Sequence, residues 1–172
     1  MNIAVIISII IIVISLIGIL FTGINTKFQI NIIRLNEAEA NIDAALRKRY
    51  DILNKCINII KNNTDEKKVL ENIKKSRSKK LNMFELDHEL NKAMEELNEY
   101  IKKYPNLEKI EQFRNINLNL LESESEINAF KQYYHDIATS YNKMVKSFPG
   151  NIEALFKGYK VKAYFENENT SN

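Results

Sequence analysis

An uncharged apolar run near the N-terminus constrains this chain more than any other feature. It extends from Ile3 to Ile24, reads IAVIISIIIIVISLIGILFTGI, and contains no charged side chain. Because a helix rises about 1.5 Å per residue, the run spans roughly 33 Å, which matches the hydrocarbon core of a bilayer. The sequence therefore predicts a membrane anchor over residues 1–26, which crosses the lipid bilayer through Ile3 to Ile24.

A cleaved signal peptide is the alternative to a retained anchor. Signal peptides have a basic segment before a shorter apolar stretch and end in a small-residue cleavage site. Here no Lys or Arg precedes the run, and Phe21-Thr22-Gly23-Ile24 is a poor cleavage site. A lipoprotein is excluded because no Cys follows the run closely. We therefore expect the anchor to be retained.

The flanks of the run predict its orientation. Met1-Asn2 carries no basic side chain, whereas Lys27 and Arg34 follow the run closely. Basic residues favour the cytoplasmic side of a spanning helix. We therefore expect the N-terminus outside and the rest of the chain in the cytoplasm. Labelling of a cysteine near Asn172 by an impermeant thiol reagent in intact cells would contradict this orientation.

The composition after the anchor favours long helices. The chain has only 4 Gly and 2 Pro, and 27% of its residues are charged. Turn-forming residues are thus scarce, which indicates an all-α fold. The single Cys56 excludes both an internal disulfide and a cysteine zinc site.

Apolar residues recur in alternating steps of three and four along three segments. The first runs from Leu35 to Ile60, and it can continue directly from the anchor because Asn25 to Asn31 contains neither Pro nor Gly. Within it, Arg49 interrupts the apolar seam and is expected to form a structural ion pair. The chain is expected to reverse around residues 62–66.

The second apolar segment runs from Met83 to Tyr104 and ends before Pro105, and the third runs from Phe113 to Phe148. We expect an elongated antiparallel bundle of three to four long helices over residues 27–165. Residues 151–165 are short and apolar, and are expected to form one or two helical turns that fold back onto the bundle. Residues 166–172 are predicted to be a disordered tail.

The chain resembles the LemA family of bacterial membrane proteins. The first matching motif is Ile42-Asp43 followed by Leu46-Arg47-Lys48-Arg49-Tyr50-Asp51-Ile52-Leu53. The second, more specific series comprises Tyr104-Pro105-Asn106-Leu107, Phe113, Glu122, Glu124, Ile127, Tyr141-Asn142, Val145, Phe148-Pro149 and Tyr164-Phe165-Glu166. Each piece alone is weak, but their ordered spacing is specific.

The resemblance implies a single-pass anchor at the N-terminus and a bundle of long antiparallel helices in a bacterial cell membrane. It brings no established enzymatic activity, so no catalytic residue is carried over. The chain departs from the family at Asn54, where the family has Pro, and at His135, where it has Asn. A helix kink at the first position and a polar contact at the second therefore cannot be assumed.

A metal site is the strongest chemical alternative. Glu85-Leu86-Asp87-His88 forms an E-x-x-H pattern, which di-iron helical bundles use twice. The second histidine, His135, has Gln132 where the pattern needs Glu, so solvated helix-face residues are the preferred interpretation. Cys56 lies on the apolar seam and is expected to pack as a small apolar residue. Four aromatic residues are likewise expected to pack in the core: Tyr133, Tyr134, Tyr141 and Phe148.

The basic segment Lys74 to Lys80 admits three interpretations: a solvated turn, a weak contact with anionic lipid, or a contact with nucleic acid. A solvated turn is preferred, and nucleic acid is least favoured because aromatic residues are absent nearby.

No phosphate-binding, dinucleotide-binding or hydrolase motif is present. No catalytic, cofactor-binding or metal-binding residues are predicted, and no cofactor is expected. We expect a non-enzymatic scaffold or protein-interaction module at the bacterial cytoplasmic membrane, which binds a protein partner or itself. The alternative is a sensor that binds a small ligand within the bundle.

Overall fold

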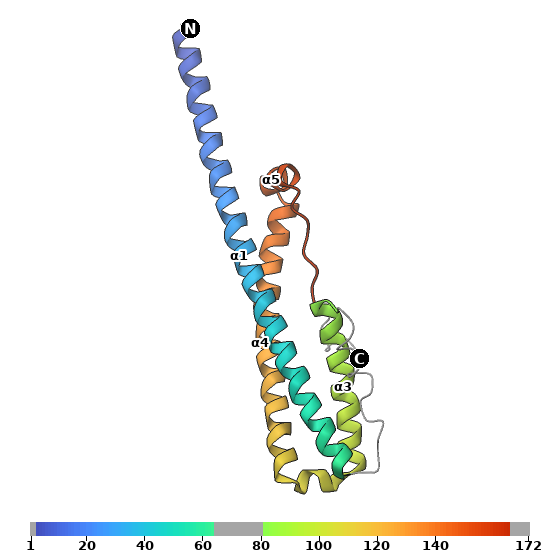
Figure 1. The fold of residues 1–172 in the computed structure, drawn as a ribbon. Coiled ribbons are helices and arrows are strands. Elements are labelled where there is room, and N and C mark those ends of the chain that lie inside the picture. The colour runs from blue at the N-terminus through green and yellow to red at the C-terminus, as the bar shows by residue number, and fades with distance from the viewer. Residues whose placement is uncertain (1–2, 64–80, 166–172) are drawn as a thin grey trace. The chain divides into compact units, whose positions relative to one another are not determined.

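A computed structural model describes residues 3–63 and 81–165, and every regular element in these ranges is helical (Figure 1). The elements are α1 (Ile3–Asn63), α3 (Met83–Lys103), the 3-10 helix η1 (Pro105–Lys109), α4 (Glu111–Lys146) and α5 (Gly150–Lys157). The predicted all-α fold is confirmed. The basic segment Lys74 to Lys80 and the predicted tail 166–172 lie outside the described residues.

Helix α1 joins the predicted anchor to the first bundle helix without a break. No Pro or Gly occurs between Asn25 and Asn63 to end it, as the sequence indicated. Within the apolar run, Ser8 donates a hydrogen bond to the carbonyl oxygen of Ala4 at 2.9 Å, and Ser15 donates to that of Ile11 at 2.8 Å. These hydroxyls are therefore satisfied inside the helix, as lipid requires.

The other helix ends follow from local chemistry. Asn82 caps α3, because its side-chain oxygen accepts hydrogen bonds from the backbone N–H groups of Phe84 and Glu85, both at 3.0 Å. At the far end, Pro105 cannot continue an α-helix, and it begins η1 instead. The predicted stop before Pro105 is confirmed.

The chain forms two compact units, which we describe separately. The terminal unit comprises residues 1–37 and 134–172, and the central unit comprises residues 38–133. Both α1 and α4 contribute one part to each unit.

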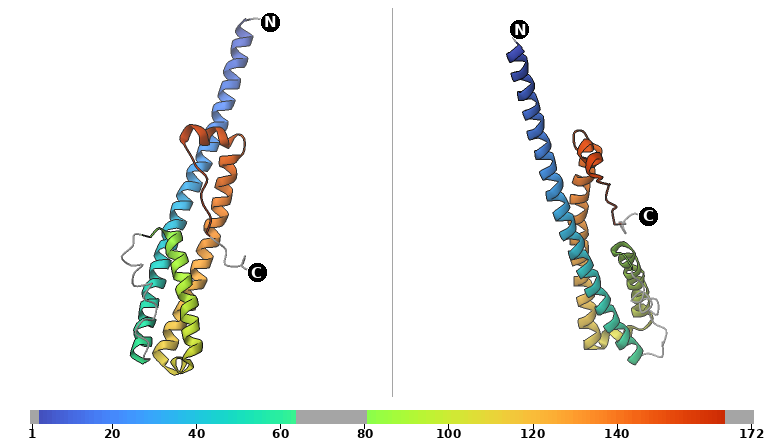
Figure 2. Two further views of the ribbon diagram at one scale, coloured as in Figure 1. Left: turned by 90° about the vertical axis from the view of Figure 1, so that its right-hand side faces the viewer. Right: turned by 45° about the horizontal axis from the view of Figure 1, so that its top comes forward.

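In the central unit, α1, α3 and α4 lie side by side, and α4 runs antiparallel to the other two (Figures 1 and 2). Helices α1 and α3 run in the same direction (Figure 1). The reversal that the sequence predicts around residues 62–66 falls mainly on residues 64–66, which lie outside the described residues. The core consists of apolar side chains from all three helices and includes Ile42, Leu46, Leu53, Cys56, Ile57, Ile60, Leu90, Leu97, Phe113, Leu120 and Ile127.

In the terminal unit, the end of α4 packs against α1, and α5 lies crosswise to both (Figure 2). The ring of Phe28 lies 5.7 Å from the ring of Tyr141 and 5.0 Å from that of Tyr159, measured between centroids. The predicted helical turns within residues 151–165 are confirmed as α5. The expectation that this apolar segment packs onto the bundle is wrong in part, because Leu155 and Phe156 are exposed.

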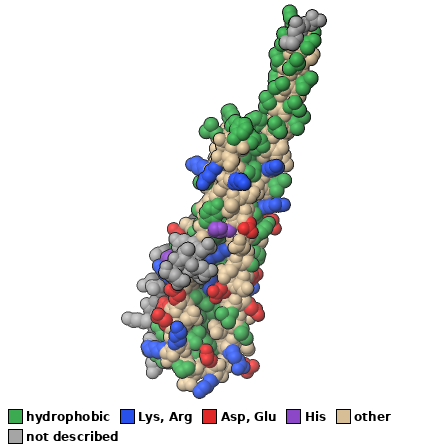
Figure 3. Space-filling view, turned by 180° about the vertical axis from the view of Figure 1, so that it is seen from behind, with side chains coloured by type: hydrophobic (Ala, Val, Ile, Leu, Met, Phe, Trp, Pro, Cys, Tyr) green, Lys and Arg blue, Asp and Glu red, His purple; other side chains and the backbone are tan. Residues whose placement is uncertain are grey.

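On the face seen in Figure 3, the side chains of the first part of α1 are largely apolar. Within the described residues, α1 is the one helix that is long and apolar enough to cross a membrane, by length and composition. None of the side chains in its most apolar window is buried.

Candidate functional site

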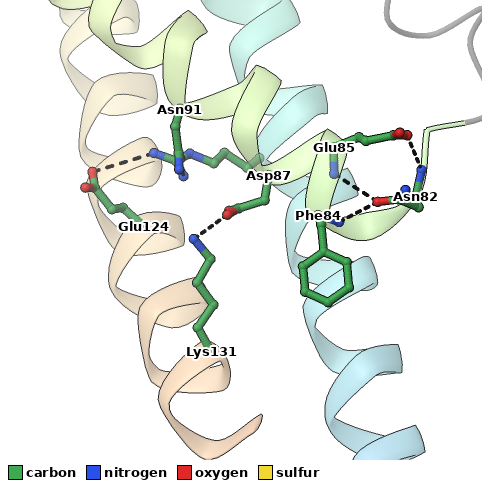
Figure 4. Close-up of polar contacts among 8 residues, drawn as sticks. Asn82, Phe84, Glu85, Asp87, Asn91, Glu124 and Lys131 are labelled. Carbon is green, nitrogen blue, oxygen red and sulfur yellow. Dashed lines mark hydrogen bonds and ion pairs between the residues drawn. The ribbon is translucent and has the colours of Figure 1, made fainter. Parts of the chain in front are cut away.

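Buried charged and polar side chains from three helices meet in the central unit (Figure 4). Arg49 of α1 and Asp87 of α3 are buried. The Arg49 guanidinium donates a hydrogen bond to Asn91 Oδ1 of α3 at 3.1 Å, and its second terminal nitrogen lies 3.8 Å from Glu124 Oε2 of α4. One side chain thus connects all three helices, and the predicted ion pair at Arg49 is confirmed.

A second ion pair joins α3 to α4. The carboxylate of Asp87 pairs with the ammonium group of Lys131, and both side chains are largely buried. Its other oxygen, Oδ1, is buried without a hydrogen-bond partner among the described residues. Opposite charges that are buried together are costly to separate, because removing one partner leaves an uncompensated charge in a low dielectric. We call Arg49, Asp87, Asn91, Glu124 and Lys131 the interhelix charge cluster.

The cluster links particular faces of the three helices. Each charged group in it finds its partner on a different helix, so a shift of one helix by one turn would break the pairs. Ion pairs on the surface contribute less to stability than buried ones. Asp43 and Arg47 form such an exposed i,i+4 pair on α1 at 2.8 Å. The hydrogen bond from Arg47 to Asp43 also raises the pKa of Arg47. The cluster is therefore suited to specifying one packing arrangement.

The residues of the E-x-x-H pattern lie in the first turns of α3. Glu85 completes a capping box, because its carboxylate accepts a hydrogen bond from the backbone N–H of Asn82 at 3.0 Å (Figure 4). His88 is exposed on α3. Among residues 3–63 and 81–165, no three His, Cys, Asp or Glu side chains lie close enough together to hold a metal ion. We did not predict the Asn82 cap, although Asn-x-x-Glu before an apolar run is its recognised pattern.

Cys56 is fully buried in the core of the central unit, as predicted. Burial raises the pKa of its thiol to about 12. A thiolate is the nucleophilic form of cysteine, so we expect this thiol to react slowly at neutral pH.

In the terminal unit, polar side chains of α4 hold the segment that follows α5. Asn142 donates a hydrogen bond to the carbonyl oxygen of Lys162 at 2.9 Å and accepts one from the N–H of Lys162 at 2.7 Å. The same amide donates to the hydroxyl of Tyr164 at 3.1 Å, and Thr139 donates to that hydroxyl at 3.3 Å. These donors lower the pKa of Tyr164, because they stabilise the phenolate.

Aromatic residues complete this attachment. Tyr134 donates to the carbonyl oxygen of Ala163 at 2.9 Å, and its ring meets that of Phe165 edge-on at 5.4 Å. Burial raises the pKa of Tyr141. The ring of His135 lies 4.5 Å from that of Tyr164, and His135 Nε2 is buried without a hydrogen-bond partner among the described residues.

The predicted core positions of the four aromatic residues are half correct. Tyr134 and Tyr141 are buried, whereas Tyr133 is 42% exposed and Phe148 is 79% exposed. Phe148 is exposed because α4 ends at Lys146, so the helical spacing that we used no longer applies at this position.

A cavity of about 370 Å³ lies where α1 and α3 end in the central unit. It is lined by Asn63, Lys103, Tyr104, Pro105, Asn106, Leu107 and Ile110. Four of these residues belong to the Tyr104-Pro105-Asn106-Leu107 motif. The cavity has the volume of a small-molecule site.

Comparison with known proteins agrees with the sequence motifs. No curated protein matches the chain. The model of the LemA family matches residues 38–172, a range that holds both motifs, the interhelix charge cluster and the segment that Asn142 binds. Because this match covers most of the chain, the protein belongs to the LemA family.

Proposed function

We propose that this LemA-family chain is a non-enzymatic, single-pass protein of the bacterial cytoplasmic membrane, whose helical part binds protein partners or further copies of itself as a scaffold. Its N-terminus lies outside the cell and its bundle in the cytoplasm. The continuity of α1 carries this proposal, because one uninterrupted helix contains both the exposed apolar run and the first bundle helix. An apolar surface of that length is stable in lipid and unstable in water.

The buried charged groups support a structural role over a catalytic one. Arg49 pairs with Glu124 and Asn91, and Asp87 pairs with Lys131. Catalytic groups need access to substrate, whereas Arg49 and Asp87 are buried between the helices. Their interactions hold the bundle together.

A surface for partners is available on α4. Leu118 and Leu121 are both 53% exposed, and their spacing of three places them on one face of the helix. Large apolar side chains on a single exposed face are typical of helix-to-helix recognition. We propose this face as the contact with a partner helix.

In-cell photocrosslinking tests the scaffold function. We would place a benzophenone amino acid at Leu118 of the full chain, with the exposed polar position Asn98 on α3 as the matched control. We expect discrete protein adducts at Leu118 and few at Asn98, with their identities given by mass spectrometry. Absence of any protein adduct at Leu118 in cells where the chain is abundant would contradict this use of α4.

A ligand sensor is the second candidate, and the cavity at the end of α3 favours it. Its walls combine amide, hydroxyl and apolar groups. A thermal-shift screen of the purified full chain in detergent tests this function, with Ile110→Trp as the variant that fills the cavity. A compound that raises the melting temperature of the wild-type chain and not of the variant would support a sensor. Equal shifts in both proteins would contradict binding at this cavity.

A further inference from the structure

Helix α5 exposes its two largest apolar side chains and buries its one acidic residue. The side that is buried against the protein carries Gly150, Glu153 and Ala154. The side chains of Leu155 and Phe156 are 83% and 82% exposed. A helix on a water-facing surface places its large apolar residues inward and its charges outward. The arrangement of α5 is therefore typical of a helix whose outer side meets an apolar medium.

Phe148 adds to this exposed apolar surface. It lies in the turn just before α5 and is 79% exposed. We call Phe148, Leu155 and Phe156 the α5 apolar surface. Apolar side chains gather over this end of the terminal unit, with basic side chains close by (Figure 3).

The backbone around α5 keeps this surface outward. A Cβ atom at Gly150 would lie 2.4 Å from the carbonyl oxygen of Met144, so α5 starts in close contact with the end of α4. Gly158 ends α5 with a φ of 70°, and the N–H of Tyr159 then donates to the carbonyl oxygen of Ala154 at 2.9 Å. Rotation of α5 to bury Phe156 would break these contacts.

The terminal unit also sets the depth of α5 relative to the anchor. Tyr159 follows α5 directly, its ring packs on Phe28 of α1, and its hydroxyl accepts a hydrogen bond from Gln29 at 2.9 Å. Phe28 lies four residues beyond Ile24, about 6 Å along the helix. The headgroup layer on each side of a bilayer is about 5 to 7 Å thick. With Ile3 to Ile24 in the bilayer core, as proposed above, the end of α5 is level with the lipid headgroups.

The charges around the α5 apolar surface are of one sign. Between residues 137 and 165 the exposed charged side chains are all lysines: Lys143, Lys146, Lys157 and Lys160. The one acid in that range, Glu153, is buried. Lysines beside large apolar side chains are suited to anionic lipid, because the ammonium groups reach phosphates while the apolar groups enter the acyl boundary.

The geometry points to a second membrane contact: we infer that α5 lies in the headgroup layer of an anionic bilayer, with Phe148, Leu155 and Phe156 inserted and the neighbouring lysines on lipid phosphates. This inference rests on the proposed anchoring through Ile3 to Ile24. With this second contact, the terminal unit would be held to the membrane both by the anchor in α1 and by α5.

Tryptophan quenching tests the contact, since the chain has no native Trp. We would reconstitute the full chain with Phe156→Trp into vesicles of phosphatidylcholine and phosphatidylglycerol that carry bromine at a shallow or a deep acyl position. Leu16→Trp reports on the anchor, and Leu118→Trp is the control in the central unit. We expect Phe156→Trp to be quenched more by shallow bromine, Leu16→Trp more by deep bromine, and Leu118→Trp by neither.

The outcomes separate this inference from the anchoring. Quenching of Leu16→Trp without quenching of Phe156→Trp would overturn the α5 contact and leave the anchor in place. A blue-shifted but unquenched Phe156→Trp would also overturn it, and would assign the α5 apolar surface to a contact with a second copy of the chain. If Leu16→Trp were not quenched, the anchoring itself would fail.

A charge test addresses the lysines. Quenching of Phe156→Trp by shallow bromine is expected to increase with the fraction of phosphatidylglycerol. In a chain that combines Phe156→Trp with Lys157→Gln and Lys160→Gln, the increase in quenching with phosphatidylglycerol is expected to be at least twofold smaller. An unchanged dependence on phosphatidylglycerol would overturn the assigned role of the lysines.

Discussion

The side-chain amide of Asn142 binds both backbone groups of Lys162, with its nitrogen 2.9 Å from the carbonyl oxygen and its oxygen 2.7 Å from the backbone nitrogen. An amide side chain thereby replaces the hydrogen bonds that a neighbouring strand would provide. This contact holds the extended segment after α5 to α4 of the terminal unit.

Replacement of Asn142 by Leu is expected to free this segment. The variant leaves the Lys162 backbone groups without these partners, a loss of about 2 kcal/mol in local stability. Exchange of the Lys162 amide hydrogen should accelerate by roughly thirtyfold in the full chain, as measured by hydrogen exchange and mass spectrometry. Thr139→Val, which removes one bond to Tyr164, is the control and should change the rate little. Equal protection in both variants would contradict the role of Asn142.

The interhelix charge cluster is expected to show strong coupling between its members. Asp87→Leu removes the carboxylate that pairs with the largely buried ammonium group of Lys131, and should lower the free energy of unfolding by about 3 kcal/mol. Asp87→Leu combined with Lys131→Met should recover most of that loss, because the remaining charge is also removed. Asp43→Asn breaks only an exposed pair and should cost at most about 0.5 kcal/mol. Additive losses in a denaturant-based double-mutant cycle would refute the coupling.

Cys56 is expected to resist thiol reagents at pH 8 in the folded protein. Burial raises its pKa from 9.0 to about 12, so little thiolate is present. Lys109→Cys provides an exposed cysteine that should react within the mixing period. Fast reaction of native Cys56 under the same conditions would show that its surroundings are open.

The same shift predicts an effect of alkaline pH on stability. The unfolded chain releases the thiol proton above pH 9.0, whereas the folded chain keeps it up to about pH 12. The buried thiol therefore contributes its full stabilisation of the folded state below pH 9.0. This stabilisation is lost as the pH rises from 9.0 to about 12. Compared with Cys56→Ala, the wild-type free energy of unfolding should fall more steeply above pH 9. Parallel pH profiles would contradict the raised pKa.

Gly150→Ala is expected to displace α5. The added Cβ atom would lie 2.4 Å from a backbone oxygen at Met144, so one of the two segments must move, at a cost of about 1–3 kcal/mol. Gly18→Ala is the matched control, because nothing lies within 4 Å of its added Cβ atom. Calorimetry in detergent should show a lower melting temperature for Gly150→Ala alone. Equal melting temperatures for the two variants would argue against this close contact.

Much of the fold could be predicted from the sequence because helix boundaries depend on nearby residues. The continuity of α1, the stop before Pro105 and the burial of Cys56 all follow from spacing and from Pro and Gly positions. The pairing of Arg49 was also predictable, since a charge within an apolar seam needs a partner. Its particular partners, Asn91 and Glu124, were not predictable because they depend on how three helices meet.

The exposed positions near the C-terminus could not be predicted for a different reason. Spacing predicts that apolar residues are buried together, but it does not distinguish protein from lipid as the apolar medium. From spacing alone, Leu155 and Phe156 were therefore expected to pack onto the bundle. Phe148 was expected to continue the apolar face of α4. The close contact of Gly150 with Met144 at the end of α4 and the packing of Tyr159 on Phe28 of α1, which is distant in sequence, determine which way α5 faces.

Cysteine labelling across the membrane tests the central claim most directly. Asn2→Cys and Lys109→Cys, each in the full chain with Cys56→Ala, would be treated with an impermeant maleimide in intact cells and again after permeabilisation. The account predicts labelling of Asn2→Cys in intact cells and of Lys109→Cys only after permeabilisation. Labelling of Lys109→Cys in intact cells, with Asn2→Cys protected, would contradict it.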